Sequence, residues 1–289
     1  MIITEKTKCP ITEGMFGLFF EDINYALDGG LHAEMIENRS FEFFDCGGER
    51  YHWYKHYDGL YGWQGSENAS LTIAGEEPLY RVNPHYLCFH AEKPGAYFTN
   101  KSYDGIFLKK GKEYLLSFYA RSEKKEKRIT AQICKDSRAV CSQSFVIACE
   151  GWQKYETVWK AEEDVHNGEF RISAEETGTV CFDFVSLKPA DALFGVFRRD
   201  LAEALKELKP GFLRFPGGCV VEGNTIDSMY RWKLSVGIPE KRKANWNRWA
   251  VQVNDHGKYS HYNQSLGVGY CEYFLLCEYL GASPLPVCN

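Results

Sequence analysis

The sequence of 289 residues lacks an excess of basic residues and lacks an apolar run long enough for a membrane-spanning helix. Its formal net charge is −5, and its lysines and arginines are dispersed, so it has no basic field for nucleic acid. The first residues, from Met1 to Lys8, lack the apolar core of a signal peptide. We therefore expect a cytoplasmic protein that binds neither nucleic acid nor membranes.

The eleven cysteines lack the pattern of a disulfide framework, because their number is odd and their spacing is irregular. No Cys-x-x-Cys pair occurs, so we expect no metal site, and nothing in the sequence calls for a cofactor. Several cysteines lie in apolar runs and are expected to be small buried hydrophobes in a reducing compartment: Cys134, Cys149, Cys181, Cys271 and Cys277.

The hydrophobic pattern changes twice along the chain and predicts three regions. Residues 1–44 contain strand-like segments and a short predicted helix from Leu31 to Asn38. Residues 45–190 alternate apolar and polar positions in many short runs separated by turn residues, which is the pattern of an all-β sandwich. Residues 191–289 return to a pattern in which helices and strands alternate.

The outer regions have the order of elements found in α/β barrels. Their predicted elements are strands at Ile2–Thr4 and Met15–Phe20, a helix between Asp200 and Pro210, a strand at Phe212–Phe215, a helix at Gly267–Leu280 and a strand at Pro284–Cys288. We expect an α/β fold joined to an all-β fold. Three strands of a (β/α)8 TIM barrel would be interrupted, after the first strand and helix, by an inserted β-sandwich of the jelly-roll type.

Polar side chains follow two of these strands where a barrel would expose them. Glu21 follows the first strand, and Arg214 lies at the end of the strand that precedes Pro216 and two glycines. Such glycines allow close approach of a ligand or a neighbouring loop. Glu21 alone is equally consistent with capping the next element. Arg214 is expected to need carboxylate partners, and a structural ion pair is the simpler explanation for it.

Aromatic and amide side chains recur in the long loop after Phe215. Asn245–Trp249 and Tyr262–Ser265 combine aromatic faces with amide and hydroxyl groups, which is the combination that a sugar site requires. Each tryptophan taken singly is more often explained by loop packing. A groove in the sandwich is the alternative sugar site, with aromatics drawn from Trp53, Tyr54, Tyr57, Tyr61, Trp63 and Trp152, although core packing is favoured for Trp63 and Trp152.

Long motifs in both outer regions resemble the start of the family 51 glycoside hydrolases, the α-L-arabinofuranosidases. The matching segments are Gly17–Asn24, Asp28–Leu31, Glu34–Glu42, Asp200–Asn224 and Tyr262–Asn289. Two strands of the middle region, Gly111–Arg121 and Val180–Leu187, resemble the carbohydrate-binding modules of the family 4/9 type.

The resemblance implies a retaining hydrolase with an acid/base carboxyl and a nucleophile about 5–5.5 Å apart. In the family both glutamates lie on later strands, so we expect no catalytic residue in this chain and no activity of the chain alone. The resemblance implies four substrate-binding residues: Glu21, Arg214, Cys219 and Trp249. Cys219 stands where some relatives have an asparagine, and Trp249 aligns only loosely.

The expected function is therefore that of the N-terminal portion of an arabinofuranosidase. Its substrates would be arabinofuranose-containing oligosaccharides from arabinan or arabinoxylan, and relatives suggest that the parent protein forms homo-oligomers. Two alternatives remain open, a non-catalytic carbohydrate-binding protein and a barrel glycosidase with xylanase or glucanase specificity.

Overall fold

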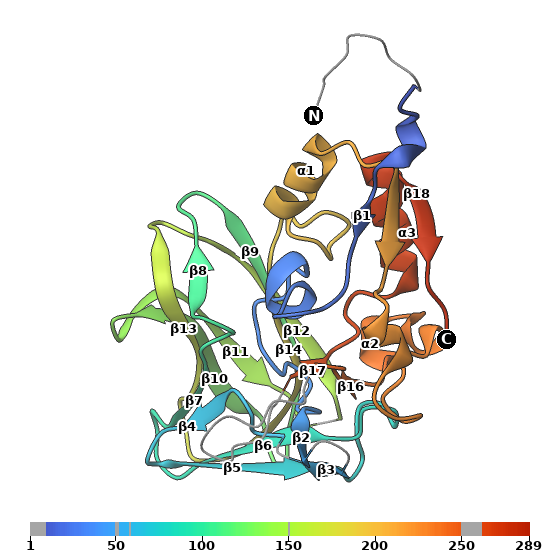
Figure 1. Ribbon diagram of the computed structural model, residues 1–289. Helices are drawn as coiled ribbons and strands as arrows, with labels where there is room; N and C mark the ends of the chain where they lie inside the picture. The colour runs from blue at the N-terminus through green and yellow to red at the C-terminus, as the bar shows by residue number, and fades with distance from the viewer. Residues whose placement is uncertain (1–9, 50–51, 58, 150, 250–261) are drawn as a thin grey trace.

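The structure, a computed structural model, describes residues 10–49, 52–57, 59–149, 151–249 and 262–289. It is mostly β-structure with few helices, and the predicted strand Ile2–Thr4 lies outside the described residues. Figure 1 shows a large body of β-strands beside a smaller region that contains α1, α3 and the C-terminus. No helix within the described ranges is both long enough and apolar enough to span a membrane.

Three short parallel strands organise the smaller region, in the order β1 (Leu18–Phe19), β15 (Phe212–Phe215) and β18 (Ser283–Pro286). Three of the four predicted outer strands are therefore neighbours in one sheet, although almost 200 residues separate the first two of them along the chain. Helix α1 (Arg199–Glu207) precedes β15, and α3 (Tyr270–Leu280) precedes β18. Gly281 ends α3 with a left-handed φ of 70°, a conformation that favours glycine.

The prediction of a helix at Leu31–Asn38 is wrong. A π-helical turn, η2 (Leu27–Leu31), is followed there by irregular turns. The polar side chains of this segment bond to distant backbone groups: Glu34 accepts a hydrogen bond from Leu187 N at 2.9 Å, and the Asn38 amide donates to Gly59 O at 3.0 Å. These tertiary bonds replace the local ones that a helix would make.

Two antiparallel sheets form the large body. One contains β11 (Arg138–Ile147), β10 (Lys127–Lys135), β13 (Val165–Ala174), β7 (Tyr97–Asn100) and β4 (Trp63–Gly65), with β8 (Ile106–Leu108) paired to β13. The other contains β12 (Gln153–Lys160), β9 (Glu113–Ser122), β14 (Gly178–Pro189), β6 (Tyr86–Ala91) and β5 (Ala69–Ala74). Smaller elements are η1 (Glu13–Met15), β2 (Phe44–Glu49), β3 (His52–Tyr57), α2 (Cys219–Glu222), η3 (Trp232–Ser235), η4 (Pro239–Lys241), β16 (Asn245–Trp246) and β17 (Asn263–Gln264).

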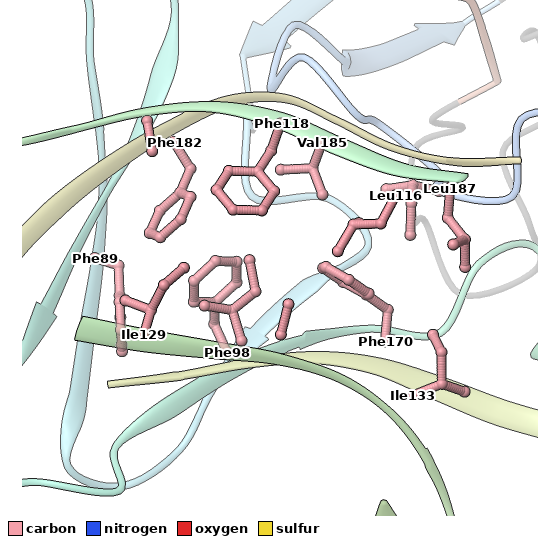
Figure 2. Close-up of a cluster of buried hydrophobic side chains, with 14 of the residues drawn as sticks. Phe89, Phe98, Leu116, Phe118, Ile129, Ile133, Phe170, Phe182, Val185 and Leu187 are labelled. Atoms are coloured by element: carbon pink, nitrogen blue, oxygen red, sulfur yellow. The ribbon is translucent and has the colours of Figure 1, made fainter. Parts of the chain in front are cut away.

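Apolar side chains from both sheets fill the space between them. Phe118 and Phe182 of the five-stranded sheet point toward Phe98 and Phe170 of the six-stranded sheet (Figure 2), and all four are fully buried. The Phe98 and Phe182 ring centroids lie 5.2 Å apart. This face-to-face packing of alternating apolar residues explains why the pattern of the middle region predicted its strands.

The large body is fixed to the smaller region by buried polar groups. The Asn83 amide donates to Glu240 O at 2.8 Å and to Arg242 O at 3.0 Å. The Arg242 guanidinium in turn pairs with Glu272 of α3 at 2.8 Å. Because Asn83 and Arg242 are both buried, these bonds hold the large body and the loop that contains Arg242 in a defined arrangement.

Candidate functional site

Glu21 joins the ends of β1 and β15. Its Oε1 atom accepts hydrogen bonds from Gly218 N at 3.0 Å and from Val220 N at 2.7 Å. Gly217 has a φ of 150°, and a Cβ atom there would lie 2.6 Å from Glu21 Cγ. The glycine turn therefore gives Glu21 room to approach the backbone, and the half-buried carboxylate is held against the turn after β15.

Arg214 lies beside Phe19, its register partner on β1, and its Cζ atom is 4.5 Å from the centre of that ring. The ion pairs found in the described part of the chain do not include Arg214, so the expected carboxylate partner is not seen there. The reason is that Arg214 is only half-buried and stacks on a Phe19 side chain that is itself 52% exposed. A partly solvated guanidinium does not require a buried counter-charge.

Cys219 and Trp249 lie at the same end of the sheet. Cys219 is the first residue of α2, directly after the glycine turn, and is exposed. Trp249 is half-buried against the core of the smaller region, and its backbone N donates to Asn247 Oδ1 at 2.8 Å. Asn247 also donates to Asp22 O at 2.8 Å, which connects the tryptophan loop to the residue after Glu21.

Asp22 is a buried acid that the sequence analysis did not single out. Its Oδ1 atom accepts hydrogen bonds from Leu27 N at 2.9 Å and from the Tyr262 hydroxyl at 3.0 Å. Burial, and next the charge of Asp28, raise the pKa of Asp22 to about 7. Only its position beside Glu21 in the motif hinted at such a role, because burial of this carboxyl depends on residues more than 200 positions away.

The pKa of Asp28, the neighbouring buried acid, moves in the opposite direction. Burial alone would raise its pKa, but hydrogen bonds from His32 at 2.9 Å and from Ser265 at 2.7 and 2.8 Å lower the pKa below its usual value. Burial lowers the pKa of His32, so the ring is neutral at physiological pH. Asp22 and Asp28 thus tie η2 to the loop around Tyr262, beneath the Glu21 turn.

The arrangement offers an oriented carboxylate, a guanidinium and an exposed thiol at one edge of a parallel sheet. Such groups can bind hydroxyls, since carboxylates accept and guanidinium groups donate hydrogen bonds. Among residues 10–49, 52–57, 59–149, 151–249 and 262–289, no group of three or more His, Cys, Asp or Glu side chains is placed to hold a metal ion.

The described aromatic side chains that were considered for a groove in the sandwich do not line a common groove. Trp63 lies in the core, with 5% of its surface exposed. Trp152 packs edge-on against Tyr86, with ring centroids 5.1 Å apart, and under the Arg121 guanidinium. Tyr61 is half-buried, and only the backbone is described for Trp53, Tyr54 and Tyr57 of β3.

Two protein families match parts of the chain. The family described as "Alpha-L-arabinofuranosidase 1 domain" matches residues 204–289, and the "Carbohydrate binding domain" of the 4/9 type matches residues 33–179. The second match covers just over half of the chain, so the chain contains a domain of that family.

Curated and solved relatives match almost the whole chain. An extracellular exo-α-L-arabinofuranosidase from Streptomyces chartreusis is 35% identical to it. That match covers 96% of this chain and 32% of the relative. The α-L-arabinofuranosidase 2 from Arabidopsis thaliana is 31% identical to it. That match covers 98% of this chain and 41% of the relative. The solved structure of an arabinose-bound family 51 α-L-arabinofuranosidase superposes with a TM-score of 0.82 at 25% identity, over 98% of this chain and 45% of that one. The chain therefore spans less than half the length of these relatives.

The expectation of a cytoplasmic protein is contradicted by these comparisons, because the Streptomyces relative is extracellular. The cysteines were a poor guide to the compartment. Cys134, Cys181 and Cys277 are buried as expected, but Cys149 and Cys271 are exposed. Cys149 follows the end of β11 and Cys271 lies on a solvent-facing side of α3, so a cysteine within an apolar run need not be buried itself.

Proposed function

We propose that this chain, which belongs to glycoside hydrolase family 51 and carries a carbohydrate binding domain, forms the substrate-binding N-terminal portion of an α-L-arabinofuranosidase. The parent enzyme would release terminal arabinofuranose from arabinan or arabinoxylan oligosaccharides. The location of the Streptomyces relative supports an extracellular site of action. The observation that carries the proposal is the Glu21 carboxylate held at the glycine turn after β15.

The smaller region is proposed to be the first three strands of a (β/α)8 barrel. Parallel order and a helix before each later strand support this assignment. All four residues of β18 are exposed, as are Phe274 and Leu275 of α3 at 42% and 39%. An exposed strand edge beside apolar helix residues is the surface on which further strands and helices of a barrel would pack.

The proposed boundaries are residues 1–44 and 191–289 for the barrel portion and residues 45–190 for the inserted module. Two facing antiparallel sheets and the family match over residues 33–179 support a jelly-roll carbohydrate-binding module. Assembly of the parent enzyme into homo-oligomers stays a prediction.

In the proposed site Glu21 accepts hydrogen bonds from sugar hydroxyls, while Arg214 lies under the sugar and supports the nucleophile. Cys219 would shape the subsite from the start of α2, and Trp249 would border the leaving-group side. Both Oε1 contacts of Glu21 are to backbone N–H groups, which leaves Oε2 for the sugar. Glu21 is thereby fixed as a ligand rather than free to attack or to move a proton.

Hydrolysis itself is proposed to require two carboxyl groups from the remainder of the parent enzyme. A retaining mechanism places an acid/base and a nucleophile about 5–5.5 Å apart, with a covalent glycosyl-enzyme intermediate. The neighbouring acid in this chain, Asp22, is 2% exposed and engaged by Leu27 N and Tyr262, so it cannot reach a glycosidic bond.

An assay with an aryl α-L-arabinofuranoside tests this division of roles. The purified chain is expected to release no aryl alcohol above the uncatalysed rate. The Arg214→Ala variant serves as the control for a contaminating hydrolase. Turnover by the wild type that this variant loses would contradict the proposal that these residues bind substrate without cleaving it, whereas equal turnover by both proteins would identify a contaminant.

A further inference from the structure

Two cysteines of the five-stranded sheet face each other across neighbouring strands. Cys88 on β6 and Cys181 on β14 are register partners in an antiparallel pair, and their Sγ atoms lie 3.2 Å apart. Directly opposed residues in such pairs have Cα atoms roughly 4.5–5.5 Å apart. That spacing falls within the range that disulfides span, about 4.4–6.8 Å. A bond between these sulfurs therefore needs only small side-chain rotations and no movement of the strands.

Small molecules in solution can reach this pair. Cys181 is buried and Cys88 is half-buried, and both line a cavity of about 770 Å³ together with Tyr86, Arg121 and Cys149. The cavity lies on the side of the sheet away from the aromatic core, since Leu87 and Phe89, the residues flanking Cys88, are the ones buried between the sheets.

The two thiols are also chemically unequal. A hydrogen bond with Cys181, which outweighs burial, lowers the pKa of Cys88, whereas the same bond and burial raise the pKa of Cys181. Attack on an oxidant requires a thiolate and access to it, so we expect Cys88, the more exposed of the two, to react first.

We propose that Cys88 and Cys181 are a dithiol site that low-molecular-weight disulfides convert into a cross-strand disulfide. The Cys88 thiolate attacks one sulfur of the oxidant, for example oxidised glutathione, and releases one small thiol. Cys181 then loses its proton and attacks the Cys88 sulfur, which releases the second small thiol. One S–S bond forms in the protein and one is broken in the oxidant, so the protein loses two hydrogens and two small thiols are produced.

Peptide mapping tests this proposal on the intact wild-type chain. The chain is incubated with oxidised glutathione, remaining thiols are alkylated, and the protein is digested without reduction. We expect one cross-linked peptide pair that contains Cys88 and Cys181, with glutathione adducts confined to other cysteines such as the exposed Cys219 and Cys271. Alkylation of both cysteines, a stable glutathione adduct at Cys88, or a bond from Cys88 to Cys149 would each overturn the proposal.

Thermal unfolding provides a second measurement. A bond between positions 88 and 181 closes a long loop, so oxidation is expected to raise the unfolding midpoint by at least about 5 °C. The matched control Cys149→Ser removes the third thiol of the cavity and should keep both the cross-link and the shift. Cys181→Ser should lose both, and an equal redox shift in Cys181→Ser and the wild type would contradict the assignment.

Discussion

Glu21 Oε1 accepts a hydrogen bond from Val220 N at 2.7 Å, across 199 positions of sequence. A second bond to the same oxygen comes from Gly218 N. Through these contacts the Glu21 side chain, which follows β1, becomes part of the turn after β15. The candidate site is thus a property of two adjacent parallel strands, and its shape depends on residues that each strand end supplies to the other.

An added side chain at Gly217 should destabilise the glycine turn more than one at Gly218. A Cβ atom at Gly217 would meet Glu21 Cγ at 2.6 Å, on a backbone with a φ of 150°. Gly217→Ala is therefore expected to destabilise the fold by about 2 kcal/mol. Gly218→Ala is the matched control, because its nearest atom is a flexible Arg214 nitrogen at 3.3 Å. Thermal unfolding of both variants measures the difference, and equal midpoints would contradict this account of the turn.

Removal of the Glu21 carboxylate should cost stability as well as binding. Glu21→Ala leaves two backbone N–H groups without their acceptor and should lower the free energy of unfolding by about 2 kcal/mol. Glu21→Gln keeps an oxygen acceptor and should lose less than about 1 kcal/mol. Denaturant titration measures both values. Glu203→Ala, an exposed position on α1, is the control and should be neutral.

Asp22 should make the protein less stable as the pH rises through the weakly acidic range. Its pKa in the folded chain is about 7, against an ordinary value of 3.8. Below about pH 4 the carboxyl is protonated in both states and has no effect on stability. Between about pH 4 and 7 the unfolded chain releases the proton and the folded chain keeps it, so stability falls by at most about 4 kcal/mol. Above pH 7 both states are ionised and the penalty stays constant.

The Asp22→Asn variant isolates this effect. Glu37, whose pKa burial and the charge of Asp28 also raise to about 7, is present in both proteins, so its own contribution largely cancels in the comparison. The wild type should lose stability relative to Asp22→Asn as the pH is raised from 4.5 to 7.5. A difference between the two proteins that does not change with pH would show that Asp22 is ionised in the folded state.

Much of the architecture follows from local patterns. Alternating apolar residues predicted an all-β region at residues 45–190, where β5, β6 and β9 to β14 place apolar side chains between two sheets. The end predicted for the Gly267–Leu280 helix agrees with α3, which Gly281 ends in a left-handed conformation. The positions of the short strands β7 and β8 could not be predicted, since three or four residues give too little periodicity to detect.

The candidate site was predictable only in part. Glu21, Arg214 and Cys219 stand beside recognisable strand ends, and the structure brings them to one edge of the sheet. The partner of Arg214 could not be foreseen, because whether it meets a carboxylate or stacks on Phe19 depends on how far the site is open to solvent. The roles of Asp22 and Asp28 were also hidden, since both depend on distant partners such as Tyr262 and Ser265.

The central claim is that Glu21 belongs to an arabinofuranose-binding surface, and titration of the chain with arabino-oligosaccharides tests it most directly. NMR saturation transfer to the sugar is measured for the wild type, Glu21→Gln and the control Glu203→Ala. We predict transfer with a millimolar dissociation constant in the wild type and the control, and a loss of at least about tenfold in affinity in Glu21→Gln, about 1.4 kcal/mol. Equal binding by all three proteins would contradict the account.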